Sequence, residues 1–128
     1  MKSKRLNITI NKSPEEIFSF YINPQNSPLW LDSFIKEETD TWPVRKGTIY
    51  RNLNVKGEWN EYTVTDYKEN EIFELTSKDG NYHVRYTHRP IDNKSSELEY
   101  YEWVDKGKLE EPFTLEILNK LKILVEKK

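Results

Sequence analysis

Two ionisable side chains, His88 and Glu102, occupy positions in two series of alternate residues whose other members are tyrosine or apolar. The two alternating series are Tyr82, Val84, Tyr86 and His88, and Leu98, Tyr100, Glu102 and Val104. Because alternate residues of a strand point to one face, both side chains are expected on the buried side of a sheet. A carboxyl in an apolar cavity can act as an acid or base near neutral pH. His88 and Glu102 are therefore the candidates for a polar contact to a ligand, unless both lie at strand ends and contact water.

The other candidate site residues are aromatic and aliphatic side chains expected on the same buried face. On the sheet they are Tyr50, Tyr62, Phe73, Tyr82, Val84, Tyr86 and Tyr100, and on a C-terminal helix they are Leu118 and Leu121. Two interpretations of the tyrosines stay open. Either they fill the core, with hydroxyls bonded to water or backbone, or they line a cavity in which several hydroxyls orient a partly polar ligand.

Other catalytic chemistries find little support in the sequence. The chain has no cysteine, which excludes disulfides, thiol nucleophiles and thiolate metal sites. His83 and His88 are five residues apart on one predicted strand, so they point to opposite faces and cannot share a metal ion. The four glycines are too scattered to form a phosphate-binding loop. We therefore predict no metal and no cofactor.

Composition predicts one domain over residues 1–128 with an aromatic core. Only 35% of the residues are hydrophobic and 33% are charged, but the chain has four Trp, eight Tyr and five Phe. Each aromatic side chain can bury roughly 150–250 Å². The net charge of −2, with both signs interspersed, argues against nucleic-acid binding. No apolar run approaches the roughly 20 residues that cross a bilayer, so we expect no stable membrane insertion and a cytoplasmic protein.

Residue periodicity predicts a strand and two short helices, followed by six strands and a final helix. Ser13, Pro14 and Glu16 indicate a capped helix start. The predicted strands span residues 5–10, 34–41, 48–54, 58–68, 72–77, 82–89 and 96–104, and the C-terminal helix spans residues 111–126. Consecutive hairpins give one curved antiparallel sheet. A helix of about 15 residues is only roughly 22 Å long, so it cannot cover seven strands and should leave space at its flanks.

Four segments in this order resemble the START-like or Bet v 1-like superfamily (SRPBCC), which includes the polyketide cyclase/dehydrase and lipid-transport group. They are the strand and capped helix from Ile8 to Phe18, Asn23-Pro24-x-Asn26-x-x-x-Trp30, Gly47-Thr48-x-Tyr50, and Tyr62-x-Val64-Thr65-x-Tyr67. The resemblance implies an α+β helix-grip fold, with a hydrophobic cavity between the sheet and the C-terminal helix. It carries over no catalytic residue, because none is shared across the superfamily.

These observations favour a protein that binds a small hydrophobic or amphipathic molecule in that cavity. One alternative is a cyclase, dehydratase or hydrolase that uses the same cavity. Another is a co-chaperone-like or toxin-like protein-interaction module, and a homodimer is left open. A packed core would favour interaction, and a cavity of roughly 300 Å³ or more would favour binding. Two or more ionisable groups converging in such a cavity would favour catalysis.

Overall fold

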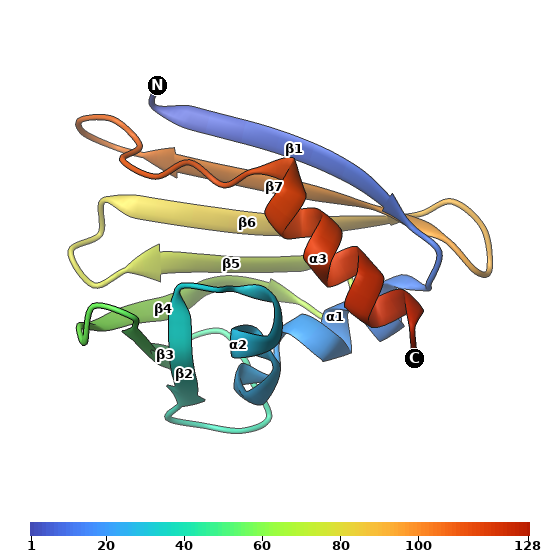
Figure 1. The fold of residues 1–128 in the computed structure, drawn as a ribbon, viewed down its shortest axis with the longest axis horizontal. Coiled ribbons are helices and arrows are strands. Elements are labelled where there is room, and N and C mark those ends of the chain that lie inside the picture. The colour runs from blue at the N-terminus through green and yellow to red at the C-terminus, as the bar shows by residue number, and fades with distance from the viewer.

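A seven-stranded antiparallel sheet carries three α-helices on one face, as the computed structural model of residues 1–128 shows (Figure 1). The elements are β1 (Ser3–Ile10), α1 (Pro14–Tyr21), α2 (Ser27–Trp30), β2 (Phe34–Thr39), β3 (Ile49–Asn54), β4 (Trp59–Lys68), β5 (Ile72–Ser77), β6 (Tyr82–Pro90), β7 (Ser96–Val104) and α3 (Leu115–Glu126). The α+β helix-grip architecture predicted from the sequence is confirmed.

The strands are paired in the order β1-β7-β6-β5-β4-β3-β2. Each strand from β2 to β6 pairs with the next strand in sequence, whereas β1 pairs with β7 at the edge opposite β2. The chain between β1 and β2 therefore crosses the sheet. This crossing places α1 and α2, which lie between β1 and β2 in sequence, over the face of the sheet (Figure 1).

Local sequence accounts for the start of α1. Ser13 accepts a hydrogen bond from the backbone N–H of Glu16, and the Glu16 carboxylate accepts one from the N–H of Ser13. This reciprocal pair is the capping box predicted from the sequence. The helix then buries Ile17, Phe18 and other apolar side chains against the sheet.

The two faces of the sheet differ as the alternation of residues predicts. Side chains of the inner face join a core with α1 and α3 that includes Val64, Phe73 and Leu98. The outer face carries ion pairs, among them Arg89 with Glu97 and Glu99. The side chains of Arg89 and Glu97 contact solvent, so this face is a solvated surface. Exposed ion pairs of this kind contribute only about 0–1 kcal/mol each to stability.

The C-terminal helix is shorter than predicted. It begins at Leu115, because Thr114 takes the N-cap position and its hydroxyl accepts the N–H of Ile117. The predicted first turn, from residue 111, instead belongs to an irregular segment that connects β7 to α3. α3 packs on β1, α1 and α2 and runs obliquely across the face of the sheet (Figure 1).

Candidate ligand-binding cavity

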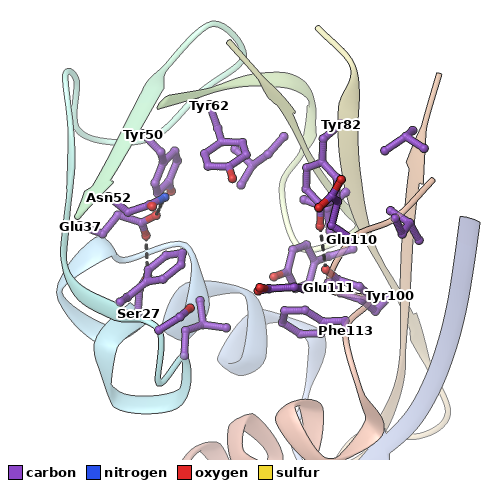
Figure 2. A pocket seen from close by; sticks show the side chains of 18 of the residues that line it. Ser27, Glu37, Tyr50, Asn52, Tyr62, Tyr82, Tyr100, Glu110, Glu111 and Phe113 are labelled. Atoms are coloured by element: carbon purple, nitrogen blue, oxygen red, sulfur yellow. Dashed lines mark hydrogen bonds between the residues drawn. The ribbon is translucent and has the colours of Figure 1, made fainter. Parts of the chain in front are cut away.

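A cavity of about 580 Å³ lies between the inner face of the sheet and the parts of the chain that cover it (Figure 2). Its walls come from strands β2 to β7, from α1 and α2, and from the segment 106–113 that precedes α3. Fifteen of its 25 lining residues are hydrophobic. None of them belongs to α3, so the wall that we expected from the C-terminal helix is supplied by the segment 106–113.

Seven of the eleven predicted site residues line this cavity. They are Tyr50, Tyr62, Phe73, Tyr82, Val84, Tyr86 and Tyr100. All seven lie on strands, where alternation places them on the inner face. Strand periodicity therefore predicted which sheet residues share the inner face, and their role in ligand binding stays a prediction.

The other four predicted residues, His88, Glu102, Leu118 and Leu121, do not line the cavity. Leu118 and Leu121 are fully buried in the core between α3 and the sheet. They lack contact with the cavity because α3 sits to one side of it.

His88 lies under α1 rather than in the cavity. Its Nε2 is 2.7 Å from the hydroxyl of Tyr21, and its ring packs against the rings of Phe18 and Tyr21. Only 4% of the residue is exposed, and its Nδ1 has no hydrogen-bond partner. Burial lowers the pKa of His88 from 6.5 to about 4, so the imidazole is neutral at physiological pH.

Glu102 holds the segment 106–113 against the sheet. Its Oε1 accepts hydrogen bonds from the hydroxyls of Tyr82 at 2.7 Å and Tyr100 at 3.3 Å. Its Oε2 accepts the backbone N–H of Phe113 at 2.7 Å. The ring of Phe113 stacks on that of Tyr100, with centroids 4.2 Å apart. Glu102 is 1% exposed, so it is a positioning residue behind the cavity wall and has no free face for a ligand.

The carboxyl group that does reach the cavity is Glu37 on β2, which the sequence did not single out. The hydroxyl of Ser27 donates to its Oε1 at 2.5 Å, and the side-chain amide of Asn52 donates to its Oε2 at 3.4 Å. Figure 2 shows Glu37 with Ser27 and Asn52 on one side of the cavity and Glu110 and Glu111 on the other. Burial raises the pKa of Glu37 from 4.5 to about 7, and the two hydrogen bonds offset only part of that effect.

A β-bulge explains why simple strand alternation would not reveal the inward facing of Glu37. Counting in twos from Phe34 places Lys36 and Glu38 on the inner face. In the structure, however, Phe34 pairs with Asn54 and Lys36 pairs with Leu53, so the register shifts between them. A bulge inserts one extra residue and reverses the facing of all that follow. The available signal was Asn52, two residues from Tyr50 on the inner face and therefore in need of a buried polar partner.

The cavity tyrosines differ in what their hydroxyls do. The Tyr50 hydroxyl donates to the carbonyl oxygen of Ile22, and those of Tyr82 and Tyr100 bind Glu102. The hydroxyls of Tyr62 and Tyr86 make no hydrogen bond within the protein, and both residues line the cavity, so these hydroxyls are available to a ligand. Burial raises the pKa of every one of these tyrosines, so all of them are neutral phenols.

No group of three or more His, Asp or Glu side chains is arranged to hold a metal ion. None of the helices has the length and apolar character needed to span a membrane.

The curved sheet, the helix across it and the cavity on its inner face define a protein with the START/Bet v 1-like fold. A START superfamily protein from Mycobacterium smegmatis superimposes with a TM-score of 0.77 at 18% identity, over 99% of each chain. Within this class the chain belongs to the family described as domain of unknown function DUF3284, whose model matches residues 29–121. The matched span contains Glu37 and all cavity residues except Tyr21 and Ser27.

Two further solved structures show the same fold. Norcoclaurine synthase from Thalictrum flavum, solved in complex with dopamine and hydroxybenzaldehyde, has a TM-score of 0.66 at 15% identity, over 98% of this chain and 87% of that one. A Mesorhizobium loti protein has a TM-score of 0.77 at 15% identity, over 98% of each chain. These identities establish the fold alone. No curated protein matches the chain significantly.

Proposed function

We propose that this protein binds a small amphipathic molecule in the cavity. The apolar body of the ligand packs among the tyrosines, and its polar group lies near Glu37. The observation that carries the proposal is the cavity itself, since about 580 Å³ is within the range of roughly 300–1,000 Å³ typical of small-molecule sites. Its predominantly hydrophobic lining with a few polar groups also fits such a site.

The norcoclaurine synthase structure supports the proposal at the level of the fold. That protein was solved with two small aromatic molecules, dopamine and hydroxybenzaldehyde. A protein with this fold can therefore bind small aromatic molecules. The stacking surfaces in the present cavity include Tyr62 and Tyr86, whose hydroxyls are free to bond a ligand.

The proposal is tested with a neutral hydrophobic dye and with native mass spectrometry. N-phenylnaphthylamine is expected to bind the purified protein at about one molecule per chain, with a rise in fluorescence. The double variant Leu75→Trp/Val84→Phe adds bulk to two lining residues and should weaken dye binding tenfold or more. Thr87→Phe, which adds a ring to β6 on the outer face, is the matched control.

An unchanged dye affinity in the folded double variant would show that the dye binds elsewhere and would overturn the proposal. Circular dichroism spectra are the check that both variants are folded. Native mass spectrometry of freshly purified protein then identifies the natural ligand by the mass that the double variant lacks.

A catalytic use of the same cavity is a second candidate, and one observation favours it. Glu37 has a pKa near 7, which suits a general acid or base at neutral pH. The experiment is to incubate the identified ligand with the wild-type protein and with the Glu37→Gln variant. Chemical change of the ligand only in the presence of Glu37 would support catalysis. Recovery of unchanged ligand from both proteins would show that the protein binds the ligand without converting it.

A further inference from the structure

Glu37 receives hydrogen bonds only from neutral groups of the protein. Its two donors are the hydroxyl of Ser27 and the amide of Asn52. No Lys, Arg or His nitrogen lies within 4.0 Å of its carboxylate, so Glu37 takes part in no salt bridge. Its neighbour Glu38, by contrast, pairs with Arg51. A carboxylate oxygen can accept about two hydrogen bonds, so each oxygen of Glu37 has capacity for one more donor.

The surfaces around Glu37 are aromatic. Tyr50 lies beside Asn52 and Glu37, and Tyr62 faces the same part of the cavity (Figure 2). Tyr50, Tyr62 and Tyr86 line the same cavity as Glu37. The faces of such rings attract cations. A single carboxylate combined with several aromatic faces is a chemical environment that favours an ammonium group over a neutral or anionic one.

We infer that the ligand of this cavity carries a protonated amine, seated against the Glu37 carboxylate, on an aromatic or aliphatic body that packs among the cavity tyrosines. The ammonium group would supply the donors that Glu37 lacks, and Tyr62 and Tyr86 would offer acceptor oxygens beside it. The inference rests on the proposed binding function and specifies the class of ligand.

Other charged groups near the cavity do not compete with this assignment. Lys106, Lys108, Glu110 and Glu111 belong to one exposed segment, and their charges sum to zero. The neighbours of Glu37 on β2 are Lys36, which lies over the ring of Trp59, and Glu38, which pairs with Arg51. The titratable groups that line the cavity with Glu37 are tyrosines, which burial keeps neutral, and the exposed Glu110 and Glu111 across the cavity, whose charges Lys106 and Lys108 balance. Glu37 is thus the group that sets the charge preference of the cavity.

The test uses three probes of one shape, naphthylethylamine, naphthylethanol and naphthylpropanoate, which are cationic, neutral and anionic at pH 8. Affinities are measured by displacement of N-phenylnaphthylamine. We expect the amine to bind about tenfold or more tightly than the alcohol, since hydrogen bonds to charged groups are stronger than neutral ones. The propanoate should bind more weakly than both. Acidification to pH 6 should reduce the affinity for the amine about tenfold, because Glu37 takes up a proton over that range, and should leave the alcohol unaffected.

Variants separate the role of Glu37 from general charge effects. Glu37→Gln should abolish the preference for the amine and keep the affinity for the alcohol within about threefold. Glu38→Gln removes one negative charge from the adjacent exposed position and should keep the preference.

Three outcomes are decisive. A preference for the amine that is lost in Glu37→Gln supports the inference. Tight binding of dye and alcohol with no preference for the amine, or a preference that survives in Glu37→Gln, overturns the inference and leaves the proposed binding function intact. Failure of the dye and all three probes to bind overturns the binding function, and the inference with it.

Discussion

Replacement of Glu37 by glutamine should stabilise the protein, and the gain should depend on pH. In the folded chain burial holds the pKa of Glu37 at about 7, against 4.5 for an ordinary glutamate. Between these two pH values the unfolded chain has already released the proton that the folded chain keeps. Folding stability therefore falls as the pH rises from about 4.5 to about 7, and the loss is complete above pH 7.

The size of the effect follows from the pKa difference. Each pKa unit corresponds to about 1.36 kcal/mol, so the rise from 4.5 to about 7 implies about 3 kcal/mol of lost stability above pH 7. Glu37 is only half-buried, and water in the cavity relieves part of this penalty. We therefore expect Glu37→Gln to gain about 2 kcal/mol at pH 8, or roughly 5–10 °C in Tm. At pH 4, where the carboxyl is protonated in both states, the gain should vanish.

Urea unfolding of the wild-type and variant proteins at pH 4, 6 and 8 measures this difference directly. Comparison with the wild type at each pH is necessary because His88 titrates over an overlapping range with the opposite sign. Glu38→Gln is the control, since its carboxylate is exposed and paired with Arg51, and it should change stability by less than about 0.5 kcal/mol. A gain for Glu37→Gln that is equal at all three pH values, or absent, would refute the assignment of Glu37 as a destabilised carboxyl.

Three further predictions concern other residues near the cavity. Glu102→Leu should destabilise the fold by about 3 kcal/mol and speed hydrogen exchange at the Phe113 amide, whereas slow exchange there would show that another group holds the segment. Tyr86→Phe should change unfolding free energy by less than about 0.5 kcal/mol, because its hydroxyl is unpaired, whereas Tyr50→Phe should lose about 1 kcal/mol; equal losses would contradict the hydrogen-bond assignment. The ring proton signals of His88 should not titrate in NMR spectra above about pH 5, and a midpoint near 6.5 would disprove its burial as a neutral ring.

Strand alternation predicted much of this molecule because most of its strands run without interruption. The strands at residues 72–77 and 96–104 have the predicted bounds. Hairpin turns end the first on both sides, whereas the second begins after a hairpin turn and ends just before the turn that contains Gly107. The inward facing of Tyr82, Val84 and Tyr86 followed from the same periodicity. These residues are three of the seven predicted side chains that line the cavity.

Tertiary placement explains what sequence reasoning could not supply. Leu118 and Leu121 have the spacing of a buried helix face, and they are buried, but spacing does not say over which strands the helix lies. The segment 106–113 forms no regular element, and long-range contacts position it, among them the hydrogen bond from the Phe113 N–H to Glu102 and that from the Leu109 N–H to the carbonyl oxygen of Met1. The bulge in β2 likewise has no glycine or proline to mark it, so the inward facing of Glu37 was hidden.

Glu102 and Glu37 together show how the role of a buried carboxyl depends on its donors. Glu102 is closed off by the protein, because two tyrosine hydroxyls and a backbone N–H occupy it from within the fold. Glu37 has fewer donors and lies on a cavity wall, so its ionised form is poorly stabilised by the protein alone. Above pH 7 the ionised Glu37 carboxylate therefore lowers the folding stability of the ligand-free protein, which is a cost of keeping this group in the cavity. A cationic ligand would remove that cost, and so the stability penalty at Glu37 and the predicted preference for an amine have one physical origin.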